Sequence, residues 1–256
     1  MSETDPTPRR GRGIYLLPNL FTTGGLFAGF FAIIAASQGR FTAACLAIFV
    51  AAILDGIDGR VARLTNTQSE FGVQYDSLAD LISFGMAPAM VMYHWALLSL
   101  RLDGPTLGKI GWLGAFLYAA CAALRLARFN SQVATVDKRY FVGLASPAAA
   151  GLMASFVWTC HELEFSGDDL RFVALGVTVV AALLMVSRIR YTSFKGSGSG
   201  PRSDRVPFVA LVVAVGILIA LWVDPPKTLL AASLLYALSG PLLWCLRRRG
   251  PAGATP

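Results

Sequence analysis

The stretch from residue 41 to residue 63 is FTAACLAIFVAAILDGIDGRVAR, an apolar run that ends with two aspartates followed by two arginines. About 20 mostly apolar residues are enough for one helical crossing of a bilayer. Similar runs recur along the 256 residues, of which 55% are hydrophobic and only 14% are charged. Soluble domains carry roughly 25% charged residues. The sequence therefore predicts an all-α, polytopic membrane protein.

The apolar runs divide the chain into about eight expected transmembrane helices, at residues 17–37, 41–63, 74–99, 107–127, 143–161, 170–187, 206–223 and 227–246. Short connections between them favour antiparallel neighbours. The sequence GSGSG at 196–200 predicts a flexible loop. We therefore expect a cytoplasmic tail at 1–14, a six-helix catalytic core at 15–195, a flexible loop at 196–205, a C-terminal hairpin at 206–246 and a second cytoplasmic tail at 247–256.

Basic residues are distributed unevenly between the two sides of this arrangement. Seventeen of the 22 Lys and Arg residues fall on the side that holds both ends of the chain. The positive-inside rule places that side in the cytoplasm. The basic residues that give the chain its net charge of +7 are then expected to contact anionic lipid headgroups. Membrane lipids are therefore expected as partners, and nucleic acid is not.

Four aspartates lie at the cytoplasmic ends of the second and third expected helices. Asp55 and Asp58 are three residues apart, and Asp76 and Asp80 are four apart, so each pair lines one face of its helix. The short connection at 64–71 predicts that the third helix folds back against the second and that the pairs converge. Carboxylates at membrane depth repel one another unless a cation compensates them. An all-oxygen ligand set favours Mg²⁺ or Mn²⁺ over Ca²⁺, with two ions clamping a phosphoryl group.

Small residues next to the aspartates predict a groove for a nucleotide. Gly59 and Ala62 leave space beside Asp58, and Gly72 relieves crowding where the two helices meet. Arg63 is placed to bind a phosphate. Each feature taken alone is equally compatible with ion pairing of the arginines or with close packing through small residues.

From Asp55 to Asp80 the pattern is D-x-x-D-G-x-x-A-R-x8-G-x3-D-x3-D. It resembles the signature of the CDP-alcohol phosphotransferase family. The resemblance implies that Asp55, Asp58 and Asp76 hold the metal ions, and that Asp80 both approaches a metal and takes the proton from the incoming hydroxyl. It also implies contacts with the CDP group by three further residues, Gly59, Arg63 and Ser69.

Four stretches outside this motif, 17–29, 125–130, 143–150 and 188–195, resemble the bacterial phosphatidylserine synthase branch of the family. Ala145 and Thr192 depart from that branch, because proline is expected at both positions. The branch implies transfer of the phosphatidyl group from CDP-diacylglycerol to L-serine, which gives phosphatidylserine and CMP. It also implies a homodimer in the bacterial inner membrane, with the active site on the cytoplasmic face.

The acceptor alcohol imposes its own requirement on the charges of the site. Glycerol phosphate or inositol phosphate calls for a cluster of basic side chains, whereas serine needs one cation for its carboxylate. Arg125 and Arg128, followed by Asn130, are therefore expected to bind serine, although the two arginines are equally compatible with anchoring to lipid headgroups. Asn19 and Thr22 enter from the same side and are expected to border the nucleotide.

Two alternatives remain open. The same chemistry with another alcohol acceptor, such as glycerol-3-phosphate, is the closer one. A transporter is the more distant one, because its carboxylates would bind a coupling ion near the bilayer midplane, often within inverted repeats. In this sequence the carboxylates lie at helix ends and no repeat is visible.

Overall fold

The computed structural model describes residues 16–65, 69–132, 140–192 and 208–249. Helices account for nearly all of them, so the expected all-α class is confirmed. In chain order the elements are α1 (Leu16–Ser37), α2 (Phe41–Thr65), α3 (Glu70–Asp80), the π-helical segment η2 (Leu81–Met86), α4 (Ala87–Trp95), the 3₁₀ segment η3 (Leu97–Asp103), α5 (Pro105–Gln132), β1 (Tyr140–Val142), α6 (Ser146–Glu162), α7 (Arg171–Val186), β2 (Arg190–Thr192), α8 (Phe208–Val223) and α9 (Pro225–Arg249).

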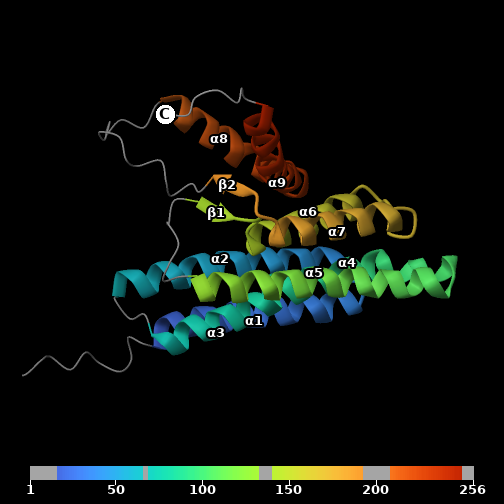
Figure 1. The fold of residues 1–256 in the computed structure, drawn as a ribbon, viewed down its shortest axis with the longest axis horizontal. Coiled ribbons are helices and arrows are strands. Elements are labelled where there is room, and N and C mark those ends of the chain that lie inside the picture. Colours follow the sequence, from blue (N-terminus) through green and yellow to red (C-terminus); the bar gives the residue numbers. More distant parts are fainter. Residues whose placement is uncertain (1–15, 66–68, 133–139, 193–207, 250–256) are drawn as a thin grey trace, which may run out of the picture.

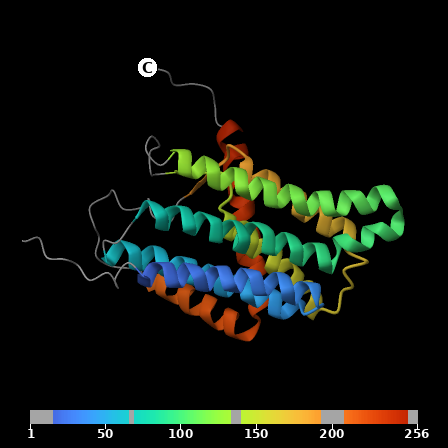
Figure 2. The same cartoon turned by 90° about the horizontal axis from the view of Figure 1, so that it is seen from below.

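The helices α1 to α5 run side by side along the long axis of the molecule, and α6 and α7 lie against them (Figure 1). Figure 2 shows α9 crossing this bundle steeply. Helix α9 packs against α6 and β2, while α8 packs against α9. The strands β1 and β2 pair antiparallel, with Phe141 opposite Tyr191. This short ladder joins the loop before α6 to the segment after α7.

Within the described residues, four helical segments are long and apolar enough to cross a membrane: Pro18–Ser37, Phe41–Thr65, Pro105–Ser131 and Pro225–Trp244. The segments Glu70–Trp95 and Leu97–Asp103, bent by 41° at their junction, make a fifth crossing if they count as one span. Each of the eight expected ranges contains a helix. The helices α6, α7 and α8 have 17, 16 and 16 residues and are shorter than these four segments. The expected loop at 196–205 and both expected tails lie largely or wholly outside the described residues.

The fifth expected helix begins later than predicted because of the residue at its start. Gly143 has a φ of +83°, which side-chain-bearing residues rarely adopt, and its N–H donates to the carbonyl of Ile189. A Cβ atom at this position would lie 2.3 Å from the carbonyl oxygen of Met185. The backbone therefore continues the turn from β1, and α6 begins only at Ser146.

Small residues form much of the interior. Ala32, Ala35, Ala44 and Ala122 are fully buried, and the helices pack closely across them. Large apolar side chains such as Phe27 are instead turned outward. This inverted distribution fits a helix bundle whose outer surface faces lipid.

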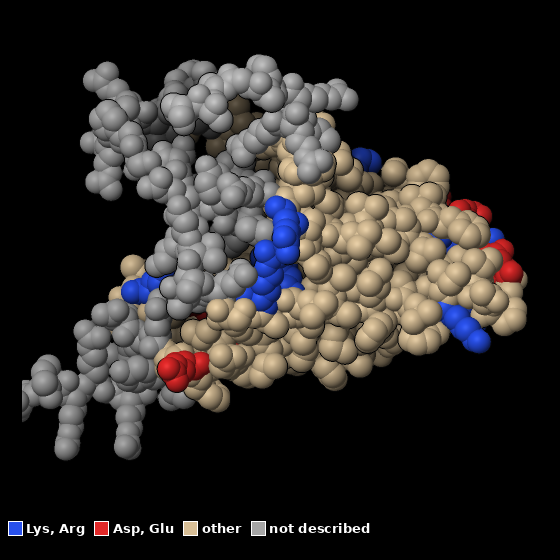
Figure 3. All heavy atoms as spheres, viewed as in Figure 1, with Lys and Arg blue, Asp and Glu red and all other residues tan. Residues whose placement is uncertain are grey.

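Charged side chains leave a wide part of the surface free. On the face in Figure 3, a broad uncharged surface separates a basic strip from a mixed cluster of acidic and basic side chains at one end of the molecule. The exposed acidic residues of the η3–α5 and α6–α7 connections are Asp103, Glu162, Glu164, Asp168 and Asp169. Arg171 pairs with Asp103 across these connections at 2.5 Å. An uncharged belt between two charged ends is the surface expected of an integral membrane protein.

Candidate active site

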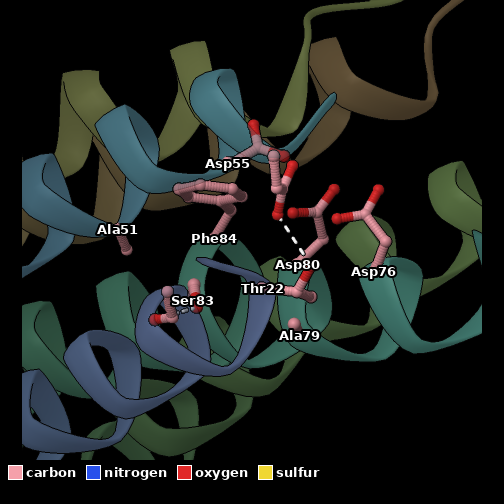
Figure 4. A pocket seen from close by; sticks show the side chains of 10 residues that line it. Thr22, Ala51, Asp55, Asp76, Ala79, Asp80, Ser83 and Phe84 are labelled. Atoms are coloured by element: carbon pink, nitrogen blue, oxygen red, sulfur yellow. Dashed lines mark hydrogen bonds between the residues drawn. The ribbon is translucent and has the colours of Figure 1, made fainter. Parts of the chain in front are cut away.

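Three carboxylates converge between α2 and α3. One carboxylate oxygen from each of Asp55, Asp76 and Asp80 lies within 4.8 Å of the other two. Figure 4 shows these side chains directed toward one another, Asp55 from one helix and the other two from the facing one. All three are half-buried. Three carboxylates this close repel one another unless a cation or a proton offsets their charge.

The helix α1 brings α2 and α3 together. The third expected helix, residues 74–99, contacts the second through η2 and α4, whereas its first part, α3, lies mainly against α1, which also packs along α2. Gly29 allows α1 to approach η2 closely. A Cβ atom at Gly29 would lie 2.6 Å from Oγ of Ser83.

Asp58 is held by a contact that the sequence analysis did not foresee. It is buried, and its Oδ2 atom accepts a hydrogen bond from the hydroxyl of Thr22, 2.8 Å away (Figure 4). Asp58 is not one of the three closest carboxylates, although it lines the same pocket. Thr22 was expected to border the nucleotide, and the structure places it against an expected metal ligand. In the sequence Thr22 lies one α-helical turn after Pro18, and this spacing does not predict Asp58 as its hydrogen-bond partner.

The four aspartates line one side of a small pocket. Its other walls are Thr22, Gly25, Ala51, Ala79, Ser83 and Phe84. The π-helical segment η2 begins directly after Asp80 and supplies Ser83 and Phe84. Oγ of Ser83 donates to the carbonyl of Gly25, 3.0 Å away, and so fixes η2 to α1. Widened helical turns of this kind recur at functional sites. The sequence contains no pattern that predicts this one.

The residues expected to contact the CDP group lie around the C-terminal end of α2 and the start of α3. Gly59 is exposed, and a Cβ atom there would meet nothing within 4 Å, so the space expected beside α2 is present. Ala62 is half-buried and Arg63 is exposed. The arginine is therefore free of the interior and able to reach a ligand in that space.

Ser69, Gly72 and Asn19 form a separate group. Ser69 caps α3, since its hydroxyl accepts the N–H of Gly72 at 3.0 Å. A Cβ atom at Gly72 would lie 3.1 Å from Oγ of Ser69 and 3.6 Å from Oδ1 of Asn19. The crowding that Gly72 relieves is therefore with Ser69 of its own turn, not with α2 as expected. The cap gives Ser69 a local structural role beside any contact with CDP.

The expected acceptor residues lie on α5. Nη1 of Arg125 donates to Oγ of Ser146, 2.7 Å away, and the guanidinium lies close enough to Asp80 to act on it electrostatically. The side-chain amide of Asn130 donates to Oγ of Ser77, 2.9 Å away. Ser77 directly follows Asp76 in the chain. Arg128 is half-buried on the same helix. Ser77 and Ser146 are new members of the site. Ser77 occupies an unspecified position of the pattern from Asp55 to Asp80, and Ser146 lies in the stretch 143–150.

The donor set fits a hard divalent cation. Every converging side chain offers a carboxylate oxygen, and neither His nor Cys belongs to the cluster. Oxygen ligands of this kind suit Mg²⁺, Mn²⁺ or Ca²⁺ rather than softer metals. The cluster can therefore bind a hard divalent cation at the pocket.

Comparison with known families accounts for this arrangement. The family model for CDP-alcohol phosphatidyltransferases matches residues 15–186, which include all four aspartates. The chain belongs to this family. The resemblance inferred from the aspartate pattern is confirmed, and the transporter alternative is not supported.

Three similar proteins have names that specify their reaction within this family. The CDP-diacylglycerol–serine O-phosphatidyltransferase of Helicobacter pylori J99 is 42% identical over 182 residues, which cover 71% of this chain and 74% of that protein. The enzyme with the same name from Bacillus subtilis 168 is 34% identical over 70% of this chain and 91% of its own length. The archaetidylserine synthase of Methanothermobacter thermautotrophicus is 35% identical, with 72% of each chain covered.

Proposed function

We propose that this protein transfers the phosphatidyl group of CDP-diacylglycerol to the hydroxyl of L-serine, which gives phosphatidylserine and CMP. The convergence of Asp55, Asp76 and Asp80 inside a family of CDP-alcohol phosphatidyltransferases carries the proposal. The acceptor follows from the relatives, because the names of all three described above contain serine.

The chain binds the two halves of CDP-diacylglycerol in different surroundings. The acyl chains lie along the apolar outer surface, and the diphosphate enters the pocket between α1, α2 and α3. The open space at Gly59 leaves room for the nucleotide, and Arg63 meets a phosphate with its planar guanidinium. Divalent cations, Mg²⁺ or Mn²⁺, held by Asp55, Asp76 and Asp80 together with Asp58 of the same pocket, would offset the charge of the diphosphate and make the serine hydroxyl more acidic.

The transfer is a displacement at phosphorus. The oxygen of the serine hydroxyl forms a bond to the β-phosphorus, and the bond from that phosphorus to the oxygen of CMP breaks. Asp80 accepts the hydroxyl proton. The carboxylate of Asp80 lines the pocket beside those of Asp55 and Asp76, so it can reach a hydroxyl bound there.

The acceptor side of the pocket is built from α5. Arg125 binds the serine carboxylate, since its guanidinium already lies near Asp80 and is oriented by Ser146. Asn130 holds α5 to α3 through Ser77, which keeps this side of the pocket next to Asp76. A single cation suits the one carboxylate of serine better than the doubly charged phosphate of glycerol phosphate.

The orientation and assembly of the protein complete the proposal. The aspartate end faces the cytoplasm of a bacterial inner membrane, because the basic residues gather on that side in the sequence. We also propose that the region 15–195 is the catalytic core, that the C-terminal hairpin at 206–246 is attached to it, and that the protein acts as a homodimer holding two metal ions per site.

Release of CMP by the purified protein tests the proposal. The assay supplies CDP-diacylglycerol in mixed micelles, Mg²⁺ or Mn²⁺, and one acceptor at a time: L-serine, glycerol-3-phosphate or inositol phosphate. We expect CMP release that depends on L-serine. Release with glycerol-3-phosphate alone contradicts the choice of acceptor, and no release with any acceptor contradicts the enzymatic function.

A further inference from the structure

Pro88 is the second residue of α4 and follows the π-helical segment η2 closely. A proline has no N–H, and in a regular helix its ring clashes with the carbonyl four residues earlier. That carbonyl belongs to Phe84, within η2. The hydrogen bonds here span five residues instead of four, since the N–H of Ala87 donates to the carbonyl of Ile82. The widened turn accommodates the proline, but the Phe84 carbonyl lacks the donor that residue 88 of a regular helix would supply.

The hydroxyl of Tyr118, on α5, supplies a donor in its place. It donates to the carbonyl oxygen of Phe84, 3.2 Å away. The side chain of Tyr118 is completely buried and Phe84 is 1% exposed, so water has little access to this carbonyl. An unpaired carbonyl inside a membrane-spanning segment is costly. The bond from Tyr118 therefore stabilises the widened turn.

The segment η2 is held from two sides. On the side of α5, a Cβ atom at Gly85 would lie 3.2 Å from Cβ of Ala122, so the two segments approach closely there. On the side of α1, Oγ of Ser83 donates to the carbonyl of Gly25. Because Asp80 directly precedes η2, its backbone is held together with the turn.

The same turn forms one wall of the pocket. Ser83 and Phe84 line it together with the four aspartates (Figure 4). A change from a widened to a regular turn would shift these two side chains, and would shift Asp80 relative to Asp55 on α2. The geometry of the carboxylate cluster thus depends on the form of η2.

We propose that Tyr118 is a positioning residue of the metal site. By donating to the carbonyl of Phe84 it holds the widened turn in the form that keeps Asp80 beside Asp55 and Asp76. Tyr118 acts through this backbone carbonyl and touches neither the cation nor the substrate. The inference rests on the proposed function only in its metal site, not in the choice of acceptor.

Mn²⁺ binding to the purified full-length protein, followed by electron paramagnetic resonance without substrates, tests this inference. Tyr118→Phe keeps the ring and removes the hydroxyl, and we expect the Kd for Mn²⁺ to rise about tenfold. Tyr191→Phe is the matched control. Tyr191 is also completely buried, and its hydroxyl donates to a backbone carbonyl, that of Ala237, 3.0 Å away, but it does not line the pocket. Its Kd should equal that of the wild type even where its Tm falls as far as that of Tyr118→Phe.

A double-mutant cycle tests the part played by Pro88. Pro88→Ala restores an N–H that can bond to the carbonyl of Phe84, so the hydroxyl of Tyr118 becomes dispensable. In that background, Tyr118→Phe should change the Kd by less than twofold. A full additional tenfold rise there contradicts the inference, because the hydroxyl would then act on something other than this carbonyl.

The same titrations separate failure of the inference from failure of the metal site. Wild-type protein that binds no Mn²⁺ refutes the proposed metal site and the inference with it. If the wild type binds Mn²⁺ and Tyr118→Phe binds it within twofold of the same Kd, or if Tyr191→Phe weakens binding equally, the inference alone is refuted.

Discussion

The hydroxyl of Thr22 lies 2.8 Å from Oδ2 of Asp58 and joins the first helix to an aspartate of the second. Hydrogen bonds to charged groups contribute about 1.5–3 kcal/mol. The bond therefore fixes one carboxylate of the pocket in a single orientation, which sets the geometry in which a cation can be bound.

Thr22→Val should weaken metal activation. The substitution keeps the shape of the side chain and removes the donor, so we expect the Mg²⁺ concentration for half-maximal CMP release to rise about tenfold. Thr178→Val is the matched control, because Thr178 is also buried but donates to Ala174 within α7. An unchanged Mg²⁺ requirement in Thr22→Val would show that Asp58 needs no such support.

Asp80→Asn should separate binding from turnover. The amide retains an oxygen for a cation but cannot accept the hydroxyl proton, and a general base contributes about 10²–10⁴-fold to a rate. We expect kcat to fall by at least about 100-fold while CDP-diacylglycerol still binds, as measured by equilibrium binding of the lipid. A variant that keeps a tenth or more of the wild-type kcat is incompatible with Asp80 as the base.

Removal of divalent cations should abolish activity reversibly. The three converging carboxylates repel one another without a cation, so treatment with a chelator is expected to stop CMP release, and added Mg²⁺ or Mn²⁺ to restore it. A chelated protein that remains fully active would contradict the metal site.

Gly29→Ala should destabilise the junction between α1 and η2. The added methyl group would lie 2.6 Å from Oγ of Ser83 and 2.7 Å from its Cα atom, and overpacking of this kind costs about 1–3 kcal/mol. We expect a lower Tm in detergent and reduced activity, because Ser83 lines the pocket. Gly176→Ala on α7 is the control, since a Cβ atom there meets nothing within 4 Å. Equal Tm values for the two variants would argue against a tight α1–η2 contact.

The sequence was sufficient for the features that depend on spacing along one chain segment. Apolar runs located the helices, and intervals of three and four residues placed Asp55 with Asp58 and Asp76 with Asp80 on common faces. Because each aspartate pair occupies the end of a helix next to a short connection, their approach to one another was also predictable.

The features that depend on which helices become neighbours were not predictable. Spacing defines the face of a helix but not its partner, so the packing of α3 on α1 and the bond from Thr22 to Asp58 had no signal. The π-helical segment after Asp80 has an ordinary apolar sequence, LISFGM. The contact of Tyr191 with Gly240 joins residues almost fifty positions apart, which local patterns do not report.

The most direct measurement of the central claim is the formation of lipid from labelled L-serine. Purified wild-type protein and its Asp76→Asn variant are incubated with CDP-diacylglycerol, Mg²⁺ or Mn²⁺ and labelled L-serine, and the lipid fraction is analysed by mass spectrometry. The account predicts labelled phosphatidylserine and an equal amount of CMP from the wild type, with at least about a 100-fold lower yield from the variant. Wild-type protein that forms no labelled lipid, or a variant that forms as much as the wild type, would contradict it.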